Sequence, residues 1–183
     1  MKKMLLLLLL VFLASPPLWA ADAVKVGFDF PYKYQFKSAD DGSKFEADGA
    51  PQGLIMTVDG FSWGGVGFES YDVLLKNSAS HKFSYLLLDY FYLWDFDFMA
   101  IGGGYGMGTT LLKGGYGSEY ERGLTDQILF KIEIPVWEMV NLRFGYQQIG
   151  AFLPNSAQLK YLLDKTYLQA GGTMTTLGVS FSF

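Results

Sequence analysis

Residues 24–36 read VKVGFDFPYKYQF, and apolar or aromatic side chains occupy every second position of this segment. The positions between them hold Lys25, Gly27, Asp29, Pro31, Lys33 and Gln35. A period of two residues is typical of a β-strand with one apolar face and one polar face. Strands of soluble proteins usually have about 5–6 residues, whereas a tilted strand that crosses a bilayer needs about 9–11. The segment therefore predicts a membrane-crossing strand.

The same alternation recurs in segments 127–134, 140–147 and 177–183. Strands placed between turn signals run over 24–36, 53–63, 66–76, 83–94, 96–108, 123–135, 139–150 and 168–183. The short connections are Gly64-Gly65, Trp94-Asp95 and 135–139. They alternate with long ones rich in Gly, Asp, Ser and Lys, which are 37–52, 109–122 and 151–167. Short turns at one end and long loops at the other are typical of transmembrane barrels. We predict an all-β fold, an eight-stranded antiparallel up-and-down transmembrane β-barrel.

The composition excludes several other classes of protein. Hydrophobic residues make up 50% of the 183 residues and charged residues only 17%, which is too apolar for a disordered chain. Cysteine is absent, and this excludes a disulfide scaffold, a zinc–thiolate site, an iron–sulfur cluster and a lipoprotein anchor. The net charge of −4 argues against nucleic acid as a partner. We expect no cofactor and no metal site.

Residues 1–20 predict a secretory signal peptide. A basic start precedes an apolar run over 4–14, and two prolines follow the run. This run is too short for a membrane-spanning helix, which needs about 20 apolar residues. Cleavage after Ala20 leaves 21–183 as the barrel domain, and cleavage after Ala23 is the alternative. Loss of two lysines and no acid with residues 1–20 changes the net charge from −4 to −6.

The second predicted strand contains an irregularity. Leu54, Met56 and Val58 share one parity, whereas Phe61 and Trp63 have the other. A β-bulge at Asp59-Gly60 would restore one lipid-facing row. Alternatively, this dipeptide forms a hairpin turn, and the strand boundaries move by about four residues.

The three tryptophans of the mature chain predict an interfacial girdle. Trp63, Trp94 and Trp137 each lie at or just past the end of an even-numbered strand, beside a short turn. They would therefore lie at one level, the periplasmic interface, where an amphipathic ring is favoured. The alternative is a set of core tryptophans in a soluble β-sandwich, but a sandwich does not require all three at one end.

The inward-facing positions predict a filled lumen. The charged residues expected there are Lys25, Asp29, Lys33, Asp89, Lys131, Glu133 and Arg143. Charges of both signs are present, as a buried network requires. Small residues on one face of strand 96–108, together with Phe98, would lie beside bulky residues of the preceding strand, which are Tyr85, Leu87, Phe91 and Leu93. Side chains fill the interior of an eight-stranded barrel.

The chain ends with LGVSFSF over residues 177–183. Its alternating residues are Leu177, Val179, Phe181 and Phe183, and the last is a terminal aromatic residue. This ending resembles the C-terminal recognition signal of Gram-negative outer-membrane barrels, and the whole mature chain is similar in pattern to small eight-stranded proteins of the OmpA-barrel or OmpX type. The resemblance implies that the barrel-assembly machinery reads these four positions. It also implies localisation in the cell outer membrane, with outer-membrane lipid as a partner.

The sequence offers no convincing catalytic set. His81 is the single histidine, and Ser84 lies at an odd spacing from it, which puts the two side chains on opposite strand faces. We therefore interpret His81 as a solvated loop residue. Residues 102–108 are rich in glycine but lack the helix and lysine of a phosphate-binding loop. The acidic first long loop lacks the spacing of an EF-hand calcium site.

These observations favour a structural or surface-interaction role without enzymatic activity, in which the long outer loops contact a surface ligand. Segment 156–165 in the last of these loops predicts a short helix. The alternatives are a narrow channel for small or hydrophobic solutes, a lipid-modifying outer-membrane enzyme, and a soluble periplasmic barrel or sandwich.

Overall fold

The computed structural model describes residues 24–38, 45–76, 81–96, 98–114, 120–154 and 167–183. The predicted signal peptide and the predicted helix over 156–165 lie outside these residues. Within the described ranges, no helix is both long enough and apolar enough to cross a membrane.

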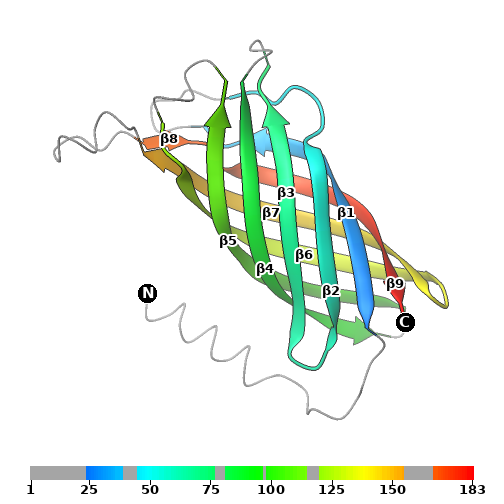
Figure 1. The fold of residues 1–183 in the computed structure, drawn as a ribbon. Helices are drawn as coiled ribbons and strands as arrows, with labels where there is room; N and C mark the ends of the chain where they lie inside the picture. The colour runs from blue at the N-terminus through cyan, green and yellow to red at the C-terminus, as the bar shows by residue number, and fades with distance from the viewer. Residues whose placement is uncertain (1–23, 39–44, 77–80, 97, 115–119, 155–166) are drawn as a thin grey trace.

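The described chain folds into one closed antiparallel barrel (Figure 1). Its strands are β1 (Lys25–Phe36), β2 (Gln52–Phe61), β3 (Gly64–Leu74), β4 (Lys82–Phe96), β5 (Met99–Lys113), β6 (Gly123–Trp137), β7 (Val140–Pro154), β8 (Tyr167–Gln169) and β9 (Gly172–Ser182). Neighbours in sequence pair from β1 to β7, β7 pairs with both β8 and β9, and β9 pairs with β1. β8 and β9 follow each other along β7, so the barrel wall has eight members. The predicted fold class is confirmed.

The two ends of the barrel differ. The strand ends that flank the connections 37–51, 75–81, 114–122 and 155–166 lie together at one end, which we call the long-loop end. The opposite, short-turn end carries Ser62-Trp63, residues 97–98 and Glu138-Met139. Figure 1 shows the strands tilted between these ends. Such a tilt is necessary to close a sheet into a barrel.

Two predicted turns are wrong in position. Gly64-Gly65 begins β3, and Gly64 pairs with Phe61 across a tight connection, with φ of +114° at Gly64. Trp94-Asp95 lies within β4, because β4 and β5 stay paired to Phe96 and Met99. Phe98, which was expected in the small-residue row of the next strand, therefore lies in the turn and is exposed.

The irregularity in β2 is the bulge rather than the hairpin. The register of β2 against β3 shifts between Val58 and Phe61. Gly60 lies within this shift with φ of +92°, a conformation that glycine adopts without steric cost. The bulge turns the chain while Asp59 keeps its side chain in the lumen, where it is buried.

A second irregularity corrects the prediction for β1. The register of β1 against β9 shifts between Pro31 and Lys33. Proline has no N–H for the ladder, and a bulge reverses which face each later side chain occupies. Tyr34 and Phe36 consequently point into the lumen, where they are 4% and 3% exposed. Lys33 is exposed on the outer wall, so the prediction of Lys33 as a lumen residue was wrong.

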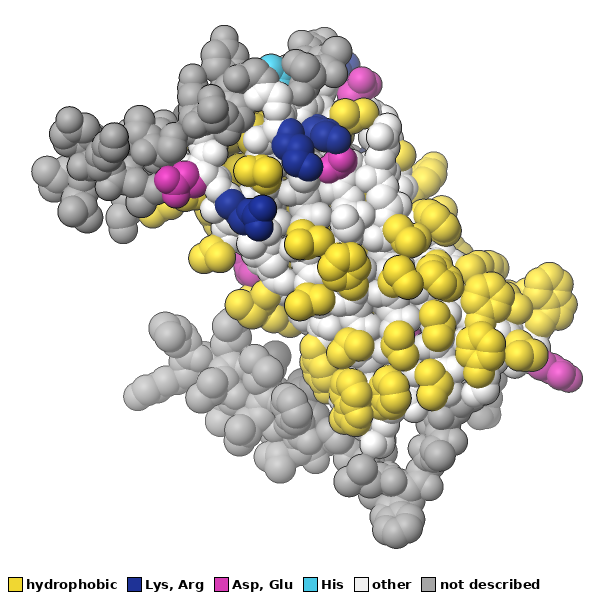
Figure 2. Space-filling view, in the orientation of Figure 1, with side chains coloured by type: hydrophobic (Ala, Val, Ile, Leu, Met, Phe, Trp, Pro, Cys, Tyr) yellow, Lys and Arg dark blue, Asp and Glu magenta, His cyan; other side chains and the backbone are white. Residues whose placement is uncertain are grey.

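The outer wall is apolar over most of its height. Outward side chains with high exposure include Phe68, Leu88, Met107, Ile128, Phe144 and Phe181. Figure 2 shows the side chains of this kind gathered in a broad field on the lower and middle part of the barrel. An apolar surface of this extent is unusual for a soluble monomer and matches the lipid-facing band of a transmembrane barrel.

The bulge in β1 predicts that a thiol introduced at Lys33 is accessible to a labelling reagent, whereas one introduced at the adjacent Tyr34 is protected. The chain has no cysteine, so each substitution introduces a single thiol. In the folded, detergent-solubilised protein, Lys33→Cys and the outward control Gln35→Cys should react readily with a polar maleimide. Tyr34→Cys should react only after denaturation. Rapid labelling of Tyr34→Cys with protection of Lys33→Cys would contradict the bulge and support the unbroken alternation predicted from the sequence.

Candidate functional site in the barrel lumen

The lumen has three levels, which follow from the order of inward residues along each strand. On β7, these residues run from Asn141 and Arg143 near the short-turn end, through Gln147, to Ala151 and Leu153 near the long-loop end. Charged side chains therefore come first, amides second and apolar groups last. We name these the charged, amide and apolar levels.

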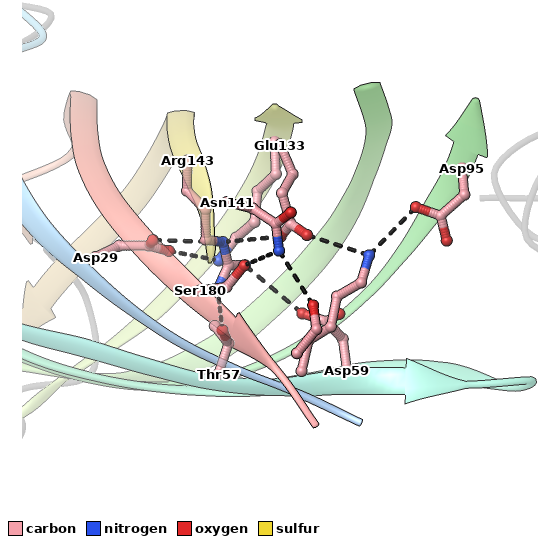
Figure 3. A network of polar contacts seen from close by, with 11 residues as sticks. Asp29, Thr57, Asp59, Asp95, Glu133, Asn141, Arg143 and Ser180 are labelled. Atoms are coloured by element: carbon pink, nitrogen blue, oxygen red, sulfur yellow. Dashed lines mark hydrogen bonds and ion pairs between the residues drawn. The ribbon is translucent and has the colours of Figure 1, made fainter. Parts of the chain in front are cut away.

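Arg143 is the centre of the charged level (Figure 3). Its Nε lies 3.5 Å from Asp29 Oδ1 and 3.5 Å from Glu133 Oε2. Its Nη2 lies 3.8 Å from Asp59 Oδ2, and its Nη1 donates a hydrogen bond to Thr57 Oγ1. The guanidinium thereby connects β7 with β1, β2 and β6 across the lumen. Five donors in a planar fork allow one arginine to serve several carboxylates.

Two lysines complete the charged level. Lys131 Nζ lies 3.1 Å from Asp29 Oδ2 and 4.7 Å from the centre of the Phe91 ring. Lys25 Nζ lies 3.1 Å from Glu133 Oε1 and 3.3 Å from Asp95 at the barrel rim. Among the described residues, this level opposes three cations (Lys25, Lys131 and Arg143) with three buried carboxylates (Asp29, Asp59 and Glu133). Pairing of both signs is the condition under which buried charge is tolerated.

The amide level joins two acids to two glutamines. Gln127 Nε2 donates to Asp89 Oδ1 at 2.7 Å, and Gln147 Nε2 donates to Glu69 Oε1 at 2.6 Å. All four side chains are buried. Asp89 faces the lumen as predicted, but its hydrogen-bond donor here is an amide rather than a cation. These bonds tie β6 to β4 and β7 to β3 at mid-height.

Aromatic rings form much of the apolar level. Tyr34 and Tyr85 both donate hydrogen bonds to the Ala170 carbonyl oxygen, at 2.9 and 2.6 Å. The Tyr71 and Tyr85 rings stack with their centres 4.9 Å apart. The same cluster includes Phe36, Ile55, Val73, Phe83, Leu87, Leu112, Ile149, Leu153 and Met174. This packed cluster occupies the lumen below the long loops.

Glycines provide the space for these side chains. A Cβ atom on Gly27 would lie 1.5 Å from Arg143 Nη1, and one on Gly106 would lie 2.0 Å from Asp89 Oδ1. Gly104 pairs with Phe91 across β4 and β5, and its Cβ would lie 2.6 Å from Phe91 Cβ. The predicted fit of bulky β4 residues against a small-residue row on β5 is confirmed.

The predicted girdle tryptophans and the predicted C-terminal assembly signal lie outside the lumen. Trp63, Trp94 and Trp137 are exposed at the short-turn end, in the β2–β3 turn, near the end of β4 and at the end of β6. Leu177, Val179 and Phe181 are on the outward face of β9, and Phe183 follows the strand. The backbone N–H of Phe183 donates to the Val24 carbonyl oxygen at 3.0 Å, which extends the closure between the first and last strands.

His81 lies directly before β4, and its carbonyl oxygen accepts a hydrogen bond from the Leu75 N–H. Ser84 is separate from it on the outer wall, where its hydroxyl donates to Asp72. Glu46, from the acidic first long loop, accepts a hydrogen bond from Lys76 at 2.8 Å, and this contact raises the pKa of Lys76. Residues 39–44 of that loop lie outside the described residues.

Sequence reasoning did not single out Thr57, Glu69, Gln127 or Gln147 as lumen residues. One signal could have found the glutamines, because both occupy the polar parity of alternating segments. Tyr34 carried no such signal, because the shift at Pro31 places it on the inward side against the sequence alternation.

Comparison with solved structures finds barrels of the same architecture. The NMR structure of the E. coli Outer Membrane Protein W gives a TM-score of 0.51 at 10% identity, over 90% of this chain and 100% of that chain. Crystal structures of Neisserial surface protein A and of OprG from Pseudomonas aeruginosa give 0.49 and 0.47, at 11% and 15% identity. They cover 90% of this chain and 98% and 96% of their own.

No protein-family model matches the chain, and no curated protein matches it either. The closed strand order and the similarity to Outer Membrane Protein W show the eight-stranded barrel fold, and at 10% identity this similarity shows the fold alone.

Removal of the Arg143 charge should destabilise the barrel strongly. Arg143→Met would leave Asp29, Asp59 and Glu133 short of their shared cation, and breaking a buried pair costs about 3–5 kcal/mol. The measurement is urea-induced unfolding of the protein in detergent, followed by tryptophan fluorescence.

The matched control is Lys76→Met, which breaks an ion pair whose two side chains are 56% and 60% exposed. Exposed pairs contribute little, so the unfolding midpoint should stay unchanged. Equal midpoints for Arg143→Met and the wild-type protein would show that the charged level does not hold the barrel together.

Proposed function

We propose that this protein is an outer-membrane barrel with a structural or surface-interaction role, a lumen filled by side chains, and no enzymatic activity. The observation that carries this proposal is the connection across the lumen by Arg143, which contacts carboxylates on β1, β2 and β6. A water-filled pore would leave such a side chain solvated, whereas Arg143 is 3% exposed.

The outer wall supports the membrane location. Its apolar rows would contact lipid, and the three tryptophans at the short-turn end would lie at the periplasmic interface. Export would follow cleavage of the signal peptide. The barrel-assembly machinery would then recognise Leu177, Val179, Phe181 and Phe183 at the end of the last strand.

The long-loop end would face the environment. The apolar level, a buried cluster with stacked aromatic rings, lies directly beneath it and would close the lumen. The loops could then serve as a contact surface for a ligand outside the cell, while the barrel provides a rigid support. Rigid barrels carrying variable loops suit this role because loops carry binding function.

Fractionation and planar-bilayer recording test this proposal together. The protein should remain with the outer-membrane fraction after osmotic shock and require detergent for release. Folded protein reconstituted into a planar bilayer should show no stable open state above the detergent-only control. Release by osmotic shock alone would contradict the membrane location. A reproducible open state of appreciable conductance would favour the narrow-channel alternative instead.

A further inference from the structure

The outer wall changes from apolar to polar towards the long-loop end of β3, β4 and β5. On β3, Val66 and Phe68 give way to Ser70 and Asp72 in the outward row. On β4, Leu88 and Leu86 are followed by Ser84 and Lys82. The change occurs at the same height on neighbouring strands, because Asp72 pairs with Ser84 and Lys82 pairs with Lys113.

A groove of about 410 Å³ lies on the wall at this height. Its polar lining includes Ser70, Asp72, Ser84, Thr109, Lys113 and Arg122. Leu86 belongs to the same lining and is 46% exposed, and Leu88 below it is 67% exposed. The groove is therefore polar on the side of the long-loop end, and it is continuous with the lipid-facing rows on the side of the short-turn end.

Cations outnumber acids around this groove. Lys82 Nζ donates to Asp72 Oδ2 at 2.6 Å, and the Ser84 hydroxyl donates to the other oxygen of the same carboxylate. Asp72 is thus occupied by Lys82 and Ser84. Within the part of the chain that the structure describes, Lys113 and Arg122 form no ion pair. Counted over the described residues, Lys82, Lys113 and Arg122 against Asp72 give an excess of two positive charges at the groove, in a chain of net charge −4.

A single carboxylate, Asp72, attracts Lys113 as well as its hydrogen-bonded partner Lys82. Lys82 and Lys113 are directly opposite each other across β4 and β5, and like charges in that position destabilise a sheet. Asp72 offsets this repulsion only in part, because one carboxylate faces three cations, and an anion between Lys113 and Arg122 would offset the remainder. Figure 2 shows Lys and Arg side chains beside an acidic one, just above the hydrophobic field.

We propose that this groove binds the phosphorylated sugar headgroup of a lipid A-type glycolipid, with its acyl chains along Leu86, Leu88 and Met107. The inference rests on the proposed outer-membrane orientation, which puts the groove at the headgroup level of the outer leaflet. Lys113 and Arg122, which have no ion-pair partner among the described residues, match a headgroup with two phosphates better than a phospholipid with one. Arg122 supplies a fork for phosphate oxygens, and Lys113 supplies a point charge.

Native mass spectrometry of the folded, full-length mature protein released from detergent micelles tests this inference. The probes are bisphosphorylated lipid A, monophosphorylated lipid A, phosphatidylglycerol and inorganic phosphate, each titrated separately. Bisphosphorylated lipid A should bind at least tenfold more tightly than each of the others. The Lys113→Ala/Arg122→Ala variant should lose at least tenfold of that affinity.

The matched control is Lys33→Ala/Lys37→Ala, which removes two exposed cations near the long-loop end on β1 and just after it. It should change the affinity by less than twofold. An equal loss in this control would indicate general attraction to a charged lipid and would overturn the inference. Equal affinity for phosphatidylglycerol or inorganic phosphate, or unchanged binding by Lys113→Ala/Arg122→Ala, would overturn it as well.

Folding of each variant is checked by its mobility on unboiled gels. If Lys113→Ala/Arg122→Ala does not fold, Lys113→Gln/Arg122→Gln, which removes both charges but keeps a polar side chain at each position, replaces it in the same titration. The result is separable from the proposed function, because a barrel that stays in the membrane without conducting can still fail to bind lipid A.

Discussion

The structure depends on the requirement that every backbone N–H and C=O in hydrocarbon be paired within the protein. A sheet meets this requirement only when its first and last strands join, and here β1 pairs with β9 from Lys25 to Phe36. The closure dictates the remaining features. It creates a lumen that side chains must fill, an outer wall that must be apolar, and two ends where connections can be polar.

Filling the lumen requires compatible charge and volume. The charged level balances three cations with three carboxylates around Arg143. Space for the guanidinium exists because Gly27 has no side chain. Towards the long-loop end, the interior becomes apolar, so that hydrogen-bonded amides and then aromatic rings succeed the ions. Ion pairs around Arg143 and the glutamine–carboxylate hydrogen bonds thus join several strands, and the wall is tied together from inside.

The sequence predicted the architecture because a period of two is a strong signal wherever one strand face is lipid and the other is lumen. It also predicted Lys25, Asp29, Lys131, Glu133 and Arg143 as an internal network. It misplaced Lys33 because a local shift at Pro31 reverses the parity, and alternation alone does not reveal such a shift. The break between β8 and β9 was missed for a similar reason, since Ala170-Gly171 interrupts the ladder without changing the composition. The groove on the outer wall depends on cross-strand register, which no single strand contains.

The most direct test of closure is gel mobility of the purified protein, before and after boiling in SDS. A closed barrel should resist SDS at room temperature and migrate differently from the boiled, unfolded chain. Identical mobility of the two samples, with far-ultraviolet circular dichroism confirming β structure before SDS is added, would contradict a closed barrel.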